Sequence, residues 1–363
     1  MAPSEKNITY GLKFQARAMV PFHSEGAQSR WLVGTNALRD ENEIQVLEFQ
    51  PEKDTIRMAE VHAHPQEVWQ IAPCPSDPRM LMTVHNEEGL HTASLWHMPP
   101  ENGALEQRAE LKGGSSVRTV AWHQSQPDAA LSVEKAKLVH WRLGKGTAEV
   151  ASECASGGSE ELSGGSWDPH DANRFCSTGG TSVQVWDLRS GQQSGAITEA
   201  HGMAVREVDF AKQQDNLIVT AGDDCKLRLW DLRKVDGTAL AELGGHSHWV
   251  WQARFNPQHD SLILSASSDA LVNLWFLPSC GAPAASKAQA QAATATPGAV
   301  KRPAGPGAAA GKDGKVQSYG DHEDSVYSVA WSSADPWTFA SLSYDGRVAV
   351  HRVPSQIKYK ILI

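Results

Sequence analysis

Histidine, hydroxyl and aspartate side chains recur in this sequence at fixed distances from one another. The three copies are His201 with Thr220 and Asp224, His246 with Ser265 and Asp269, and His322 with Ser341 and Asp345. These are the residue types of hydrolase triads, in which a carboxylate orients a histidine that takes the proton of a nucleophilic hydroxyl. A triad is one site defined by its geometry, whereas this set repeats along the chain. We therefore interpret the three sets as structural hydrogen-bond networks.

Other catalytic and metal-binding patterns are missing from the sequence. No GxSxG, HExxH, GxGxxG or phosphate-loop motif occurs. Five histidines gather in a short region, but no pair has the spacing of a structural zinc site; they are His62, His64, His85, His91 and His97. We expect a protein that is not an enzyme and that holds no metal or cofactor.

The elements around these residues read as short antiparallel strands. In residues 201–233, three apolar runs alternate with polar residues, and Gly222, Asp223 and Asp224 form a turn between the last two. The Asp of each set precedes an aromatic position by six residues: Trp230, Trp275 and, as a replacement, His351. The segment resembles a WD40 repeat, the unit of β-propeller blades. The resemblance implies a His–hydroxyl–Asp–Trp chain whose loss leaves polar groups unpaired, at about 1–3 kcal/mol each.

Repeats of about 45 residues divide the chain into seven units, which predicts an all-β, seven-bladed WD40 β-propeller. The predicted blades are 10–61, 64–111, 114–151, 160–198, 201–242, 246–319 and 322–363. Each blade is expected to own four consecutive strands, beginning with 11–20 and ending with 358–363, while residues 1–9 latch the ring. Residues 279–314 are rich in Ala, Pro and Gly and are predicted to be a disordered loop inserted in blade six.

The overall composition limits the kinds of binding partner and the cellular compartment that we expect for this protein. The 363 residues carry a formal charge of −9, and no Lys/Arg cluster suggests nucleic acid as a partner. No apolar run is long enough to cross a membrane, and the N-terminal residues do not resemble a signal peptide. The five cysteines are scattered, which favours free thiols in a reducing compartment. We expect a cytoplasmic protein without direct membrane insertion.

Two surfaces contain candidate partner-binding residues. In WD40 propellers the opening His loops and the Asp turns share one face, where we place Met203, Arg206, His248, Trp249, Trp251, Glu323, Asp324 and Tyr327. Trp249 and Trp251 are expected to lie on one strand and to point the same way, either into a partner or between blades. This rim lacks the dense Lys/Arg set that a phosphopeptide reader needs. On the opposite face, two WDLR sequences end in Arg189 and Arg233. They resemble the WDxR box of propellers that dock on the DDB adaptor of cullin-4 ubiquitin ligases.

Longer stretches of the sequence resemble one particular family of WD40 proteins. They are YGLKFQAR near the start, GDDCKLRLWD and HSHWVW in the middle, and HEDSVYSVAWSSADPWTFASLSYDGRVAVHRVP followed by KYKILI at the end. Together these resemble the EARP-and-GARP-complex-interacting proteins. The resemblance implies a scaffold for multisubunit tethers of endosomal recycling and endosome-to-trans-Golgi transport, peripheral at those membranes. A substrate receptor of a cullin-4 ligase is the alternative.

Overall fold

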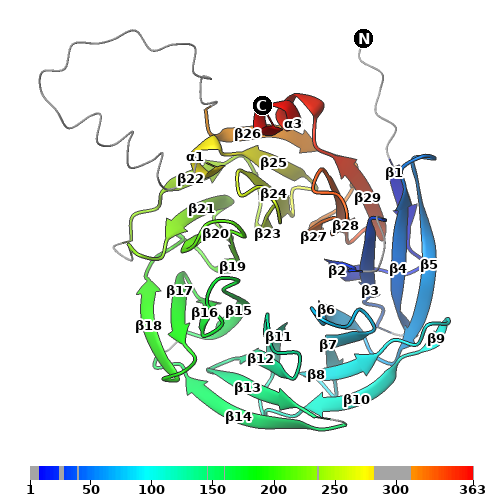
Figure 1. Ribbon diagram of the computed structural model, residues 1–363, viewed down its shortest axis with the longest axis vertical. Coiled ribbons are helices and arrows are strands. Elements are labelled where there is room, and N and C mark those ends of the chain that lie inside the picture. The colour runs from blue at the N-terminus through cyan, green and yellow to red at the C-terminus, as the bar shows by residue number, and fades with distance from the viewer. Residues whose placement is uncertain are drawn as a thin grey trace, which may run out of the picture.

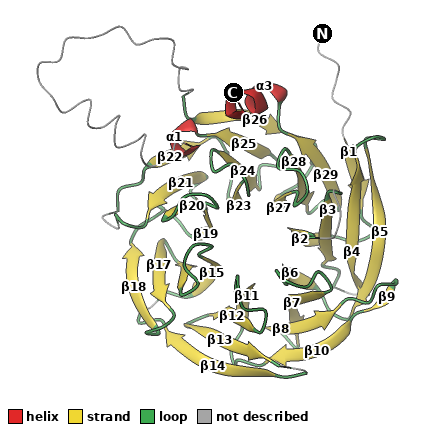
Figure 2. Cartoon of the chain, viewed as in Figure 1, coloured by secondary structure: helices red, strands yellow, loops and turns green. Residues whose placement is uncertain are grey.

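The chain forms a closed ring of seven small β-sheets around a central axis (Figure 1). The computed structural model describes residues 8–23, 28–38, 41–144, 146–158, 160–234, 237–281 and 312–362. Strands dominate, and the short helices lie at the outer edge of the ring (Figure 2). The predicted seven-bladed β-propeller is confirmed.

Each blade contains four antiparallel strands that run outward from an innermost strand at the axis. Blade one contains β2 (Ala16–Pro21), β3 (Arg30–Thr35), β4 (Asn42–Gln50) and β5 (Thr55–His64), with β9 (Gly103–Ala104) paired in parallel to β5. Blade two contains β6 (Val68–Pro73), β7 (Met80–Glu87), β8 (Leu90–His97) and β10 (Glu106–Leu111). Blade three contains β11 (Val117–Trp122), β12 (Ala129–Glu134), β13 (Lys137–Leu143) and β14 (Ala148–Ala155).

The remaining blades follow the same order until the last. Blade four contains β15 (Leu162–Trp167), β16 (Arg174–Gly179), β17 (Ser182–Asp187) and β18 (Gln192–Ile197). Blade five contains β19 (Val205–Phe210), β20 (Leu217–Gly222), β21 (Lys226–Asp231) and β22 (Ala241–Gly244). Blade six contains β23 (Val250–Phe255), β24 (Leu262–Ser267), β25 (Val272–Phe276) and β26 (Gly314–Tyr319). Blade seven contains β27 (Val326–Trp331), β28 (Thr338–Ser343), β29 (Arg347–Arg352) and β1 (Ile8–Gly11).

The two chain ends meet in blade seven, which corrects the expectation that every blade owns four consecutive strands. The predicted strand 11–20 is shortened to β2, which begins blade one, whereas Gly11 ends β1, which pairs with β29 in blade seven. The pairing runs from Ile8 opposite Val350 to Gly11 opposite Arg347. β29 is thus paired on both sides, and β1 is the outer edge strand of blade seven.

The C-terminal residues form a helix instead of the predicted strand 358–363. Helix α3 (Ser355–Leu362) follows Pro354, whose carbonyl accepts a hydrogen bond from the Ile357 amide at 2.9 Å. Ile357 and Ile361 lie four residues apart and pack with Trp337, while Tyr359 is 64% exposed. The prediction was wrong because β1 already occupies the edge that a C-terminal strand would need.

Apolar side chains fill the space between neighbouring blades. Seven clusters of buried residues each combine side chains of two adjacent blades, so the core is a ring of interfaces. Trp31 of blade one is fully buried, and its indole N–H donates to the Ala330 carbonyl of blade seven at 3.1 Å. The interface between blades one and seven, which closes the ring, is therefore packed like the other interfaces between blades.

The predicted loop of 279–314 lies mostly outside the described residues. Its first residues belong to helix α1 (Pro278–Gly281), so the predicted start of the disorder is placed too early. At its other end, Asp313 accepts a hydrogen bond from the Ser279 amide at 3.1 Å. Neither helix of the described residues is long or apolar enough to span a bilayer.

Candidate functional site

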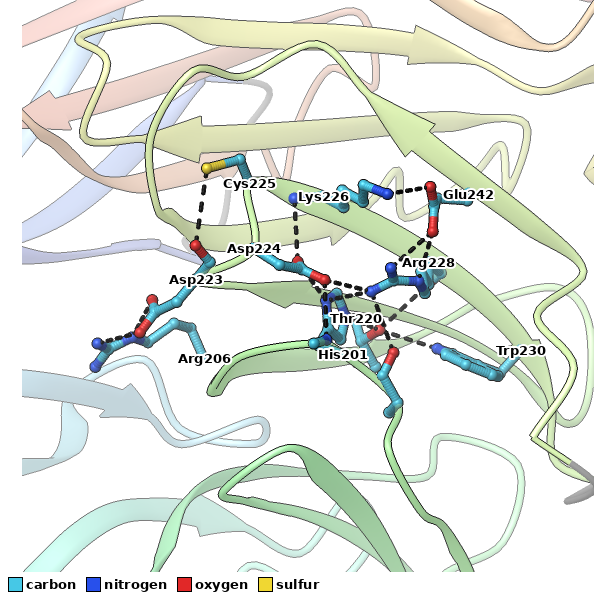
Figure 3. A network of polar contacts seen from close by, with 12 residues as sticks. His201, Arg206, Thr220, Asp223, Asp224, Cys225, Lys226, Arg228, Trp230 and Glu242 are labelled. Atoms are coloured by element: carbon cyan, nitrogen blue, oxygen red, sulfur yellow. Dashed lines mark hydrogen bonds and ion pairs between the residues drawn. The ribbon is translucent and has the colours of Figure 1, made fainter.

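The repeated polar residues of blade five form one continuous network (Figure 3). Trp230 Nε1 donates to Thr220 Oγ1 at 2.9 Å, and Thr220 Oγ1 lies 2.7 Å from His201 Nε2. His201 Nδ1 lies 2.8 Å from Asp224 Oδ1. Because a carboxylate only accepts, Nδ1 carries the proton and Thr220 donates to Nε2. Burial alone would raise the pKa of Asp224, but hydrogen bonds from His201 and Arg228 outweigh it and lower that pKa to about 2.

Blade six repeats the same arrangement. Ser265 Oγ lies 2.7 Å from His246 Nε2 and accepts from Trp275 Nε1 at 2.9 Å. His246 Nδ1 is 2.9 Å from Asp269 Oδ2. Asp269 also accepts the backbone amides of Ser247 at 2.9 Å and Leu271 at 3.1 Å, which ties two loops of this face together.

Blade seven has a looser version. His322 Nε2 lies 2.8 Å from Ser341 Oγ, and His351 Nε2 takes the place of the tryptophan at 3.0 Å from that hydroxyl. His322 Nδ1, however, is 3.7 Å from Asp345 Oδ2, beyond hydrogen-bond distance. Asp345 instead accepts the amides of Glu323 and Arg347 at 3.0 and 2.8 Å. Burial lowers the pKa of His351 to about 3, which keeps its imidazole neutral.

Blade two contains a related network outside the three predicted sets. His64 Nε2 lies 3.0 Å from Thr83 Oγ1, which accepts from Trp96 Nε1 at 2.8 Å. His85, with Nδ1 3.3 Å from the same hydroxyl, was not assigned to a network. The 19-residue spacing of His64 and Thr83 is that of His201 and Thr220, and this signal could have identified the pair. In the described residues no group of His, Cys, Asp or Glu is arranged to hold a metal ion.

The hydroxyls of these networks are inaccessible to a substrate. Thr220, Ser265 and Ser341 are all fully buried. Each already lies between a histidine and a second ring nitrogen, so the hydroxyl is fixed as a bridge. A nucleophile must reach the atom that it attacks. The geometry of these sets stabilises loops and strands and does not suit acyl transfer.

The innermost strand of every blade has a β-bulge at its second residue. The extra residue of a bulge is unpaired in the ladder, and bulges redirect side chains at rims and binding sites. The seven bulged positions are Arg17, Trp69, Arg118, Ser163, Arg206, Trp251 and Tyr327. We call them the bulge ring. They lie on the face of the ring that carries the Asp turns, as the contact of Arg206 with Asp223 shows in blade five.

Side chains of the bulge ring contact one another across blades. The Arg206 guanidinium is paired with Asp223 by two contacts of 2.7 Å (Figure 3). It also lies 4.8 Å from the ring centroid of Trp251. The Arg17 guanidinium lies 4.4, 5.0 and 5.2 Å from the rings of Tyr327, Trp69 and Trp251. Sequence reasoning missed Arg17 and Trp69 because nothing near them in the sequence indicates that blades one, two, six and seven meet here.

The other predicted residues of this face lie around the bulge ring. Met203 is 49% and Trp249 39% exposed, and the His248 ring packs on Trp249 at 5.0 Å. Trp249 precedes β23, and Trp251 is its bulged residue, so the expectation of two side chains on one regular strand does not hold. The two indoles instead meet edge to face at 6.1 Å.

Acidic residues mark the outer part of the same face. Glu323 is exposed and pairs with Arg347 at 2.8 Å. Asp324 is also exposed, and its carboxylate accepts the amide of Ser325 at 2.6 Å. Neither carboxylate is held in a buried network.

The two WDLR arginines lie on the opposite face, just after β17 in blade four and β21 in blade five. Their side chains are 71% and 69% exposed. Arg189 Nε is 3.1 Å from Asp187 Oδ1, and Arg233 Nη2 is 2.6 Å from Asp231 Oδ2. Such exposed pairs contribute little stability, about 0–1 kcal/mol, so both guanidinium groups can be shared with a partner.

Known proteins match almost the entire chain. The family described as EIPR1 beta-propeller matches residues 4–275, and the repeat described as WD domain, G-beta repeat matches residues 309–352. The chain is 36% identical to the WD repeat-containing protein DWA2 of Arabidopsis thaliana, over 97% of this chain and 98% of that protein. It is 34% and 33% identical to the EARP and GARP complex-interacting protein 1 of Rattus norvegicus and of Homo sapiens, with 98% of each chain covered.

Proposed function

The chain belongs to the EIPR1 β-propeller family, and we propose that it is a non-enzymatic adaptor for multisubunit vesicle-tethering complexes of the EARP and GARP type. Relatives that span almost the same length are named for interaction with these complexes. The adaptor would act in endosomal recycling and in transport from endosomes to the trans-Golgi network. It would be a cytoplasmic protein, held at those membranes through the tethers that it binds.

The observation that carries this proposal is the group of exposed large side chains beside the bulge ring. Met203, Trp249 and Tyr344 are 49%, 39% and 39% exposed around one mouth of the channel. Large aromatic side chains of this kind dominate the binding energy of protein interfaces. A rigid propeller presents them without ordering a loop, which lowers the entropic cost of association.

Affinity purification followed by mass spectrometry tests the proposal. We expect tether subunits to co-purify with the wild-type bait and to be depleted severalfold with a Met203→Ala, Trp249→Ala double variant. Leu240→Ala is the matched control, because Leu240 is also an exposed apolar residue, at 53%, but precedes β22 at the outer part of blade five. Absence of tether subunits from a well-expressed wild-type bait contradicts the proposal.

A second candidate function is that of a substrate receptor for a cullin-4 ligase. The observation that favours it is the equivalent placement of Arg189 and Arg233 in adjacent blades, both strongly exposed on one face. Replacing both by Ala leaves the buried Trp186 and Trp230 in place. If the double variant still co-purifies the cullin-4 adaptor as well as wild type does, or if wild type does not bind it, this candidate is rejected.

A further inference from the structure

The bulge ring concentrates positive charge and aromatic surface that are far apart in the sequence. Arg17, Arg118 and Arg206 come from blades one, three and five, and all three line the channel mouth. Trp69, Trp251 and Tyr327 come from blades two, six and seven and surround Arg17. The mouth is thus basic and aromatic in a protein whose formal charge is −9.

Two of these arginines are paired with carboxylates within the protein. Arg206 forms two contacts of 2.7 Å with the Asp223 carboxylate, which is itself buried. Arg118 lies 3.1 Å from the exposed Glu161 carboxylate. Each of these two guanidinium groups therefore has a carboxylate acceptor, although Glu161 also pairs with Lys135 at 3.1 Å.

Arg17 differs from both. Among the described residues, no carboxylate pairs with it and no hydrogen bond from its guanidinium is found. Its side chain is half-buried, and this burial lowers its pKa. Aromatic faces attract a cation, but they do not take the place of an oxygen acceptor for the five N–H groups of a guanidinium. Arg17 is thus a partly desolvated cation that lacks an anion.

We propose that the channel mouth binds a short acidic segment of a partner protein, with an Asp or Glu carboxylate on Arg17. Arginine binds carboxylates through two parallel N–H···O bonds, and loss of water around the pair strengthens them. A large apolar side chain next to the acid would pack on the exposed Trp249 and Met203. The proposal deepens the adaptor function proposed above, because it gives the chemistry of the tether segment that docks.

The chain's own insertion does not suit this role. The charged side chains of 279–314 are mostly basic; they are Lys287, Lys301, Arg302, Lys312 and the single acid Asp313. Asp313 is already held by Ser279 at the outer edge of blade six. An acidic segment from another protein is the occupant that complements Arg17.

Selection from a displayed library of random linear peptides tests the proposal without knowledge of the partner. We expect the peptides retained by the wild-type protein to be enriched in an Asp or Glu next to a large apolar residue. A synthetic peptide of the selected sequence should bind about tenfold more weakly when its acid is replaced by the amide. A selected pool without acidic enrichment, or equal binding of acid and amide peptides, overturns the proposal.

Three variants assign the binding to Arg17. Arg17→Met keeps an unbranched stem among the aromatic rings and should weaken the acidic peptide about tenfold or more. Arg17→Lys keeps the charge without the paired donors and should bind with intermediate strength. Arg108→Gln is the matched control, because Arg108 is an exposed arginine that is paired with Glu106 in the outermost strand of blade two; it should change the affinity less than twofold. Equal losses in Arg17→Met and Arg108→Gln would show a diffuse charge effect and overturn the assignment.

Parallel purification of tethers separates this proposal from the adaptor function. If wild type binds acidic peptides through Arg17 but captures no tether subunits, the mouth is a binding site and the proposed function fails. If wild type captures tethers and the peptide selection shows no acidic preference, the function stands and this inference fails. Thermal unfolding of each variant, expected within a few degrees of wild type, shows that the fold is retained.

Discussion

Truncating Asp269 to alanine should destabilise the propeller more than truncating Asp345, although the two residues occupy equivalent turns. In blade six, Asp269 accepts from His246 Nδ1 at 2.9 Å and from two backbone amides. His246 lies deep under the turn, with a side chain that is 0% exposed, so its N–H would lose its partner. In blade seven, His322 Nδ1 is 3.7 Å from Asp345 and has no hydrogen bond to lose.

The size of the effect follows from the carboxyl group of Asp269, which is 5% exposed. Burial raises its pKa, but hydrogen bonds from His246 and Ser247 outweigh burial and lower it to about 2. Against about 3.9 in an unfolded chain, that depression corresponds to roughly 2–3 kcal/mol of folding free energy. Because the folded pKa is depressed, this contribution is present above about pH 4 and is lost as the pH falls towards 2.

Urea unfolding at pH 7, followed by tryptophan fluorescence, measures both variants. We expect Asp269→Ala to lower the free energy of unfolding by about 2 kcal/mol. Asp345→Ala should lower it by about 1 kcal/mol, because the amides that donate to Asp345 lie at an exposed turn where water can replace the carboxylate. The difference in the free energy of unfolding between wild type and Asp269→Ala should become smaller as the pH falls from 4 to 2. An Asp345→Ala variant that is destabilised as much as Asp269→Ala would refute the reasoning.

Three further outcomes are expected. Trp31→Ala should cost about 3–5 kcal/mol in urea unfolding, because it empties the fully buried contact between blades one and seven. Removal of residues 1–12 should expose the edge of β29 and produce oligomers in size-exclusion chromatography with light scattering, whereas removal of 1–6 should leave a monomer. Burial lowers the pKa of His351 to about 3. The neutral imidazole therefore stabilises the folded protein above about pH 6.5, and this contribution is lost as the pH falls towards 3. Between pH 7 and 5 the free energy of unfolding should fall by about 2 kcal/mol from this residue. His351→Phe should reduce that pH dependence of the urea midpoint.

The blades and their polar networks could be predicted because they are local repeats. His201, Thr220, Asp224 and Trp230 lie in contact because one repeat contains all four at fixed spacing. The same spacing does not reveal that His322 and Asp345 are 3.7 Å apart. That distance depends on small shifts of two loops, which residue types do not encode in an obvious way.

The errors concern contacts that join distant parts of the chain. An alternating segment such as residues 8–11 has the same pattern whether it pairs with its own blade or with β29. Residues 358–363 alternate like a strand, yet Ile357 and Ile361 also fit one side of a helix. The partners of Arg17 could not be predicted, because the bulges that bring it to Trp69 and Tyr327 have no distinct local signature.

The pairing of β1 with β29 also sets the order in which the protein can mature. The N-terminal strand leaves the ribosome first, but its partner is made near the end of the 363-residue chain. At the usual rates of translation, roughly 20–70 s separate the two events. During that time the earlier blades can form one after another, while Ile8, Tyr10 and Leu12 lack the blade-seven side chains of the cluster that they join. The nascent chain therefore carries β1 without its strand partner through most of its synthesis.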